Sequence, residues 1–254
     1  MPLNFLIPSY GRKVLRRAFR AAEQTLPKPI THVETQEHVA ALTFDDGPDP
    51  EYTPRLLDIL KRHRAKGTFF MIGEAAAKYP EIVRRAVSEG HALGNHSWNH
   101  PQLSLIGSKA RRKQILACEQ VLAPYGHKLF RPPYGQQSIG IFLDARILGY
   151  KVVFWSVDVG DWWDSDPSRM ARLLLDRVYP GCVIVLHDRL FRDPSGEPNL
   201  TREPNNDRLP MLQALDNFLE RSVQHYRFVT VPELLRLSTN SRKATLTQQF
   251  KASV

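Results

Sequence analysis

The sequence has 254 residues, of which 42% are hydrophobic, and a formal net charge of +9. This length suits one large domain with a substantial core, and the composition excludes a disordered chain. The two cysteines, Cys118 and Cys182, are far apart, which excludes a disulfide framework and a four-cysteine zinc site; we expect two buried free thiols. The positive charge favours acidic partners, but no nucleic-acid-binding motif accompanies it, so we expect no nucleic acid partner.

Residues 1–37 are predicted to form an N-terminal extension. Within them, apolar residues recur at helical spacing among basic residues, which predicts a short basic amphipathic helix; the apolar positions are Val14, Leu15, Ala18, Phe19 and Ala22. Two interpretations stay open. Residues 1–25 make a peripheral contact with an anionic membrane, or the helix packs across the fold with its arginines in water.

Neither a transmembrane segment nor a secretory signal is recognisable in the sequence. No run reaches the roughly 18 consecutive apolar residues that a membrane-spanning helix needs. The short apolar stretch at the start precedes the basic residues, whereas the charges come first in a signal peptide. We therefore expect a cytoplasmic protein, with or without membrane association through the extension.

From residue 39 onward, short β-rich runs alternate with helical patterns. The predicted strands are Val39–Phe44, Thr68–Ile72, Ala92–Asn95, Lys128–Arg131, Lys151–Val157, Cys182–His187 and Arg227–Val231. The predicted helices are Pro54–Arg64, Pro80–Glu89, Ser108–Ala123, Pro167–Val178 and Leu209–Arg221. This alternation is typical of a parallel sheet with helices outside it, either open or closed into a barrel.

Two segments are predicted to lie outside regular structure. Residues 189–208 contain three prolines and a Ser-Gly pair, and this run is longer than most connections. Because it follows His187 directly, we expect it to border an active site. Residues 237–254 form a polar, basic tail that is expected to fray. The predicted domain therefore covers residues 38–236.

Polar clusters follow five of the predicted strands. They are Asp45-Asp46-Gly47-Pro48, His96-Ser97-Trp98-Asn99-His100, Arg131-Pro132-Pro133-Tyr134-Gly135, Asp158 with Asp161-Trp162, and His187-Asp188. In a parallel α/β barrel the carboxyl ends of all strands meet on one face, where active sites lie. We therefore expect these clusters to converge in space.

His96 and His100 form a candidate metal-binding pair. If Ser97–His100 is a helical turn, the i, i+4 spacing points both imidazoles the same way, and imidazole suits zinc and similar divalent ions. One carboxylate of Asp45-Asp46 would complete a site of two histidines and one carboxylate, and the other would accept a proton from water. The alternative for Asp-Asp-Gly-Pro is a turn without chemical function.

Arg131 and His187 add the remaining parts of a hydrolytic site. An arginine fixed near a carboxylate keeps it ionised and oriented. A histidine near an aspartate has a raised pKa and can donate a proton to a leaving amine. Each residue alone has a structural alternative, a surface charge for Arg131 and a strand end for His187. Five clusters on one barrel face together predict a metallohydrolase.

The chain resembles the polysaccharide deacetylases, which are carbohydrate esterase family 4 and share the NodB-homology domain. The similarity lies in five ordered motifs, Thr43–Pro48, His96–His100, Arg131–Gly135, Asp158–Trp162 and Val185–Asp188, and covers residues 38–236. The resemblance implies a distorted (β/α)7 barrel. It also implies a hydrolase that removes N-acetyl groups from a GlcNAc-containing glycan, such as peptidoglycan or chitin oligosaccharide, with a divalent metal. The metal expected is zinc, with cobalt, manganese and nickel as alternatives.

The resemblance also implies roles for individual residues. Asp45 would be the general base and Arg131 would hold it in place. Asp161 would tune His187, the general acid. The metal ligands would be Asp46, His96 and His100.

The substrate-binding residues implied by the resemblance lie in three of the motifs. The main-chain N–H of Tyr134 would stabilise the oxyanion, next to Pro132. Trp162 and Leu186 would line the pocket for the acetyl methyl group. Three alternatives remain: an O-acetyl esterase of the acetylxylan type, a small-molecule amidase with the same site, and a catalytically silent glycan-binding protein.

Overall fold

The computed structural model describes residues 28–191 and 204–237, which contain one eight-stranded sheet. The strands are β1 (Val39–Asp45), β2 (Gly67–Met71), β3 (Ala92–Asn95), β4 (Gly126–Phe130), β5 (Lys151–Val152), β6 (Val157–Asp158), β7 (Val183–His187) and β8 (Arg227–Val229). Their order is β5-β4-β3-β2-β1-β7-β6, with β8 beside the start of β1, and neighbouring strands are parallel. The distorted (β/α)7 barrel predicted from the sequence is confirmed.

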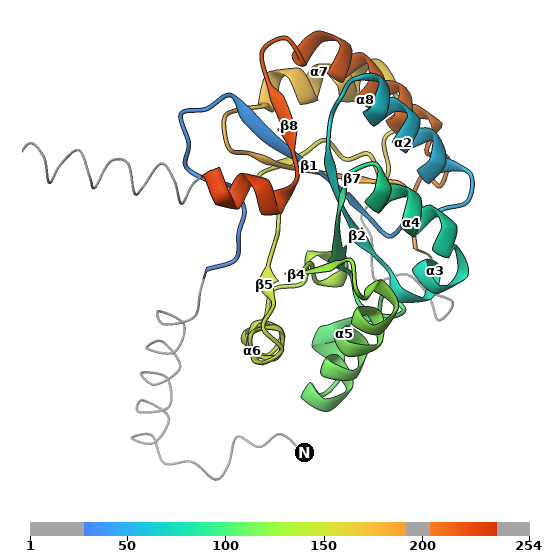
Figure 1. Cartoon of the computed structure of the whole chain (residues 1–254), viewed down its shortest axis with the longest axis vertical. Coiled ribbons are helices and arrows are strands. Elements are labelled where there is room, and N and C mark those ends of the chain that lie inside the picture. Colours follow the sequence, from blue (N-terminus) through green and yellow to red (C-terminus); the bar gives the residue numbers. More distant parts are fainter. Residues whose placement is uncertain (1–27, 192–203, 238–254) are drawn as a thin grey trace, which may run out of the picture.

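The helices surround the sheet (Figure 1). They are α2 (Tyr52–Arg62), α3 (Gly73–Lys78), α4 (Pro80–Ser88), α5 (Ser108–Leu122), α6 (Ile139–Ile147), α7 (Pro167–Arg177) and α8 (Leu209–Ser222), with 3-10 turns η2 (Leu103–Leu105) and η3 (Pro133–Gly135). Residues 231–237 are helical as well. Neighbouring helices contact each other in the order α7, α8, α2, α4, α3, α5 and α6. This succession forms the outer layer that covers the apolar face of the sheet.

The five predicted helices are present, each within two residues at either end, and α3, α6 and the helical residues 231–237 are additional. Helix α3 is only six residues long, too short for a 3.6-residue period to be recognised. Helix α6 carries apolar residues all round, so its sequence lacks a polar stripe. The amphipathic helix predicted within the first 27 residues lies outside the described residues. Beyond that segment, Ile30 and Val33 donate main-chain hydrogen bonds to Val152 and Gly181.

The predicted strand Lys151–Val157 is wrong as a single element, because the chain changes partners in the middle. Strand β5 pairs with β4 at one edge of the sheet, whereas β6 pairs with β7 at the other edge. Between them, the N–H of Val153 donates to Phe130 and the N–H of Ser156 donates to Val183, both at 2.9 Å. The segment thereby closes the barrel. A continuous apolar run cannot indicate such a change of partner.

Strand β1 organises the packing because all seven of its residues are buried. Its alternate residues Ala40, Leu42 and Phe44 belong to the large core cluster between sheet and helices, whereas Val39 and Ala41 belong to the cluster inside the barrel. Thr43 and Asp45 continue the inward series. The Phe44 ring packs over Gly67 of β2, where a Cβ atom would come within 2.7 Å of the ring.

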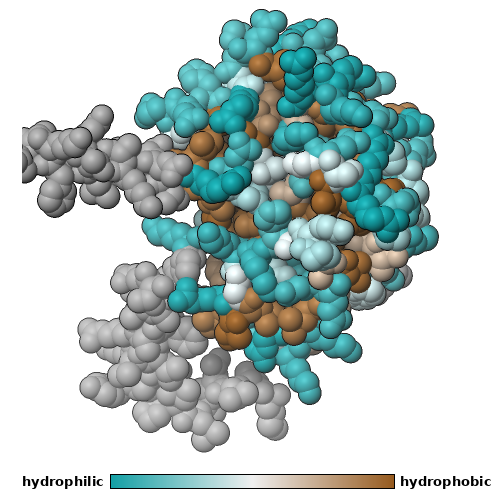
Figure 2. Space-filling model, in the orientation of Figure 1, coloured by the Kyte–Doolittle hydropathy of each residue, from teal (hydrophilic) through white to brown (hydrophobic). Residues whose placement is uncertain are grey.

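Both cysteines are free and buried, as predicted. Burial raises the pKa of Cys118 to about 12 and that of Cys182 to about 11, so both thiols stay protonated. Among the described helices, none has the length and apolar character needed to span a membrane. Figure 2 shows a mostly hydrophilic face with apolar patches, one of them in the region of α6, whose Leu143 and Ile147 are exposed.

The packing of β1 generates a stability prediction. Replacing Phe44 by alanine removes a fully buried ring from the layer between sheet and helices, so we expect the free energy of unfolding to fall by about 3–5 kcal/mol. Chemical denaturation measures this change. Leu105→Ala is the control, because Leu105 is 76% exposed, and its effect should stay below about 0.5 kcal/mol. Equal effects of the two substitutions would contradict the packing described.

Candidate active site

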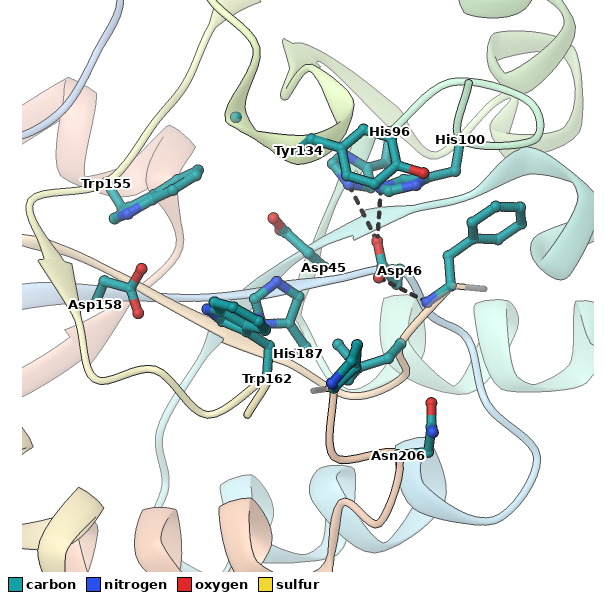
Figure 3. Close-up of a pocket in the computed structure, with 14 residues that line it drawn as sticks. Asp45, Asp46, His96, His100, Tyr134, Trp155, Asp158, Trp162, His187 and Asn206 are labelled. Carbon is teal, nitrogen blue, oxygen red and sulfur yellow. Dashed lines mark hydrogen bonds and ion pairs between the residues drawn. The ribbon is translucent and has the colours of Figure 1, made fainter. Parts of the chain in front are cut away.

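A cavity lies at the carboxyl ends of the strands, where the predicted clusters converge (Figure 3). The residues that line it are Asp45, Asp46, His96, His100, Tyr134, Gly135, Trp155, Asp158, Trp162, His187, Leu190, Phe191, Pro204 and Asn206. They come from all five motifs and from both described ends of the predicted loop 189–208. The predicted convergence is confirmed, and so is the expectation that this loop borders the cavity; residues 192–203 of the loop lie outside the described residues.

Asp46, His96 and His100 form a compact, buried group of possible metal ligands. Oδ1 of Asp46 lies 3.2 Å from Nε2 of each histidine (Figure 3). Asp46 follows β1 in a left-handed conformation, with φ of 72°, which turns its carboxylate toward the loop after β3. Burial acts to raise the pKa of Asp46, but the two imidazoles outweigh it and hold this pKa far below its usual range.

The helical turn that would have aligned His96 with His100 does not form at Ser97–His100. Ser97 and His100 instead have left-handed φ values of 70° and 57°. Short side chains hold this loop: Ser97 N–H donates to Oδ1 of Asn95 at 2.9 Å, and His100 N–H donates to Oγ of Ser97 at 3.1 Å. The imidazoles therefore converge through loop geometry and not through helical periodicity.

The donor atoms of this group fit a divalent cation. Nδ1 of His96 lies 2.7 Å from the main-chain oxygen of Arg131, which can only accept, so a neutral His96 carries its proton on Nδ1. Its Nε2 then directs a lone pair toward Oδ1 of Asp46, a buried oxygen that accepts no hydrogen bond within the part of the chain that the structure describes. With His96 neutral, two acceptors face each other at 3.2 Å, and either a bound cation or a second imidazole proton would compensate this contact. Two histidines and one carboxylate are a common donor set of catalytic metal sites.

The main chain of the loop after His187 completes the surroundings of Asp46. The N–H of Phe191 donates to Oδ2 of Asp46 at 2.9 Å, and the Phe191 ring lies 5.0 Å from the His100 ring. Oδ2 of Asp46 is thus bound by the main chain while Oδ1 faces the two histidines, which orients the carboxylate. Sequence patterns gave no signal for this contact, because its donor is a main-chain group.

Asp188, next to His187, packs against the loop that carries Asp46. Its buried carboxylate accepts a short hydrogen bond from Thr53 and lies over Gly47, where a Cβ atom would come within 2.3 Å of Oδ2. Burial raises the pKa of Asp188 to about 7. Gly47 is therefore required here because a larger residue would displace Asp188.

Arg131 and Asp45 form an ion pair inside the barrel. The Arg131 guanidinium is fully buried, and its Nη1 donates to Asp45 Oδ1 at 2.7 Å and to Thr43 Oγ1 at 2.8 Å. Its Nε and Nη2 donate to the main-chain oxygens of Val153 and Phe154 at 3.1 and 2.9 Å. With each nitrogen bonded, the arginine fixes one oxygen of Asp45 and leaves the carboxylate at the cavity wall.

His187 and Asp161 form a second pair on the other side of the cavity. Nδ1 of His187 lies 2.9 Å from Oδ1 of Asp161, and the His187 main-chain N–H donates to Oδ2 at 2.7 Å. Burial acts to lower the pKa of His187, but Asp161, with smaller contributions from Asp46 and Asp45, raises it to about 9. The imidazole is therefore protonated at neutral pH, as an acid must be. His187 and Asp45 also occupy paired positions on adjacent strands β7 and β1.

The remaining predicted site residues divide into two groups. Tyr134, with a left-handed φ of 57°, and Trp162 line the cavity. Pro132 and Leu186 are buried behind the cavity wall and are not among its lining residues. The prediction missed Trp155, which sits where the barrel-closing segment changes partners, 5.4 Å from the Arg131 guanidinium. Trp155 was missed because its neighbours in the sequence are mostly apolar, as in a strand without a functional residue.

The ligand geometry generates a prediction about metal binding. Replacing Asp46 by alanine removes the only carboxylate of the three-residue group, so we expect Co²⁺ affinity to fall at least about tenfold. Visible absorbance during a Co²⁺ titration measures this loss. The control is His225→Ala, which removes an exposed histidine outside the cavity. Unchanged Co²⁺ affinity after the Asp46 substitution would refute the ligand set.

Comparisons with known proteins agree with this geometry. Residues 32–153 match the family model described as polysaccharide deacetylase. A peptidoglycan-N-acetylglucosamine deacetylase of Bacillus cereus is 37% identical over 207 residues, which cover 80% of this chain and 91% of that protein. A chitooligosaccharide deacetylase of Sinorhizobium fredii is 39% identical, covering 58% of this chain and 70% of that protein. The structure of peptidoglycan deacetylase PdaC from Bacillus subtilis superposes with a TM-score of 0.72 and 30% identity, covering 85% of this chain and 99% of that one. The chain therefore belongs to the polysaccharide deacetylase family.

Proposed function

We propose that this protein is a zinc-dependent deacetylase that removes N-acetyl groups from a GlcNAc-containing glycan. The observation that carries the proposal is the placement of two different proton-transfer groups beside one candidate metal site. Asp45 is held by a buried arginine, and His187 is held by a buried aspartate. Zinc is proposed because two neutral imidazoles and one carboxylate suit it, with open positions left for water and substrate.

The proposed chemistry begins at Asp45. When bound at Asp46, His96 and His100, a divalent cation supplies Lewis-acid chemistry, since it polarises a carbonyl and lowers the pKa of a water molecule. Asp45 takes the proton from the attacking water, because Arg131 occupies only one of its two oxygens. The main-chain N–H of Tyr134 is proposed to stabilise the oxyanion, supported by the left-handed turn of the chain at that point of the cavity wall.

The leaving group requires an acid, and we assign this role to His187. Its pKa of about 9 keeps the imidazole protonated at neutral pH, and Asp161 fixes the ring through Nδ1, which leaves Nε2 for the substrate nitrogen. Proton donation to that nitrogen produces a free amine and acetate. We assign Trp162 to the wall that receives the acetyl methyl group, because it lines the same cavity as His187 (Figure 3).

The substrate class is proposed from the named relatives. These act on peptidoglycan and chitooligosaccharide, according to their names. Both polymers contain N-acetylated glucosamine, which is the shared chemistry proposed for this chain. An acetylated xylan would present an ester instead of an amide to the same residues, so an O-acetyl esterase is the alternative that an assay must separate.

We further propose separate roles for the domain and for the segments that flank it. Residues 38–236 are the catalytic domain, preceded by the basic extension 1–37 and followed by the polar tail 237–254. Residues 1–25 are proposed to contact an anionic membrane at its cytoplasmic face, where acidic lipids attract basic segments. The basic and apolar positions of this segment support the proposal.

Acetate release tests the proposed activity. The zinc-loaded protein is expected to release acetate from N-acetylchitooligosaccharides or peptidoglycan fragments, to lose this activity with a chelator, and to regain it with zinc. Asp45→Asn should lower kcat by about 10²–10⁴-fold, because the general base is lost. Asp58→Asn is the control, since it removes an exposed carboxylate of α2 and should leave kcat unchanged.

Three outcomes of this assay would contradict the proposal. Full activity of the metal-stripped protein would exclude metal-dependent hydrolysis. Faster turnover of acetylated xylan than of the amide substrates would favour the O-acetyl esterase. Absence of acetate release from every substrate, with zinc bound, would favour a silent glycan-binding protein.

Vesicle binding tests the proposed membrane contact. Deletion of residues 1–25 removes the basic amphipathic segment, so we expect a loss of sedimentation with vesicles that contain phosphatidylglycerol. Vesicles of phosphatidylcholine alone serve as the comparison, because they lack the anionic charge. Unchanged binding of the shortened chain to the anionic vesicles would refute the contact.

A further inference from the structure

Arg208, directly before α8, is a fully buried arginine that no part of the reaction described above uses. It ends the polar run Pro204–Arg208, which in the sequence resembles an exposed loop. A guanidinium removed from water is unfavourable unless its charge and its N–H groups find partners. The position of those partners therefore indicates what this residue does.

The close anionic partner of Arg208 is Asp161. Nη1 donates to the main-chain oxygen of Asp161 at 2.9 Å and lies 3.6 Å from Oδ2 of its carboxylate. Both side chains are buried, so water and salt screen the pair only weakly. Within residues 28–191 and 204–237, Nε and Nη2 of Arg208 make no hydrogen bond. The guanidinium is therefore bound to Asp161 through one end.

The same carboxylate holds His187, so Asp161 lies between two cationic groups. Its Oδ1 and Oδ2 accept from Nδ1 and the main-chain N–H of His187. The segment that carries Arg208 makes a second contact with the same motif, since Asn205 N–H donates to the main-chain oxygen of Trp162 at 2.8 Å. Motif residues 161 and 162 are thus attached to the chain just before α8.

Arg208 also alters the charge around His187. The imidazole is faced by carboxylates, which stabilise its protonated form: Asp161, Asp45, Asp46 and Asp158. The guanidinium lies behind Asp161 and opposes them, because it shares the negative charge of Asp161 and repels an imidazolium. Removal of the guanidinium is therefore expected to favour the protonated form of His187 further and to make it a weaker acid toward the leaving nitrogen.

Stability alone does not account for Arg208. A buried ion pair contributes little net stability compared with apolar residues of similar volume, and among the described residues this guanidinium has partners for only one of its three nitrogens. We propose that Arg208 is a positioning residue for the reaction, whose guanidinium spans the main-chain oxygen and the carboxylate of Asp161 and thereby orients the Asp161–His187 pair. This inference rests on the proposed function, because it assigns a part to a residue behind the proposed acid.

Kinetics of the zinc-loaded full chain test the inference. Acetate release from an N-acetylchitooligosaccharide is measured from about pH 6 to 10, together with the melting temperature. The variants are Arg208→Gln, which removes the charge, and Arg208→Lys, which keeps it without the planar group. Arg221→Gln is the matched control, because it removes an equal charge from the exposed surface of α8.

For Arg208→Gln we expect kcat to fall about tenfold or more, with KM changed less than about twofold. The alkaline limb of kcat should move to higher pH by about one unit, because His187 becomes a weaker acid without the guanidinium. A merely structural role would lower the melting temperature without moving this limb. Arg208→Lys should keep the limb in place and recover only part of kcat, and Arg221→Gln should behave as the wild type.

A folded Arg208→Gln variant with the wild-type kcat and alkaline limb would overturn the inference. Should that variant fail to fold, Arg208→Lys decides the question, and a wild-type kcat in this variant would overturn the role of the guanidinium. Failure of the proposed function is a separate result, because in that case the wild-type protein itself releases no acetate.

Discussion

The arrangement of side chains at the mouth of this barrel depends on the contacts of the Arg131 guanidinium. It lies inside the barrel, shielded from water, where an unpaired charge would be strongly destabilising. Compensation comes from the carboxylate of Asp45, the hydroxyl of Thr43, and the main-chain oxygens of Val153 and Phe154. These partners belong to β1 and to the segment that closes the barrel. A single side chain thereby fixes the proposed base relative to the strands around it.

The main chain of Arg131 extends this control to the candidate metal site. Its carbonyl oxygen determines which nitrogen of His96 carries the proton, and so directs the other nitrogen toward Asp46. Arg131 therefore couples the position of the proposed base Asp45 to that of His96, one of the candidate metal ligands. The acid belongs to a different unit, because His187 depends on Asp161 and on the segment before α8. The site combines two separately supported halves that meet between β1 and β7.

The sequence was sufficient for the parts of the site that follow from barrel geometry. Asp46 and His96 were expected to meet because the carboxyl ends of parallel strands share one face. Other features depend on tertiary contacts that leave no local pattern. Ser97 adopts a left-handed conformation in a loop held by hydrogen bonds, which no helical spacing indicates. The Phe191 contact uses a main-chain donor, and Arg208 is buried although its neighbours are polar. The periodicity of apolar residues indicates which face of a helix or strand is buried. It does not indicate which polar residues become buried through tertiary contacts.

The strands around the candidate active site are not equally well paired, and the segment that closes the barrel is the weakly paired part. Strands β5 and β6 are each joined to their neighbour through only two residue pairs, whereas β1 is joined to β7 through five. Thermal opening of a sheet begins where its ladder is shortest. Trp155 and Asp158 lie in this weakly paired segment, whereas Asp46 and His96 follow β1 and β3, each of which pairs with β2 through four residue pairs. The Trp155 side of the cavity is therefore expected to yield before the side that carries the candidate metal ligands.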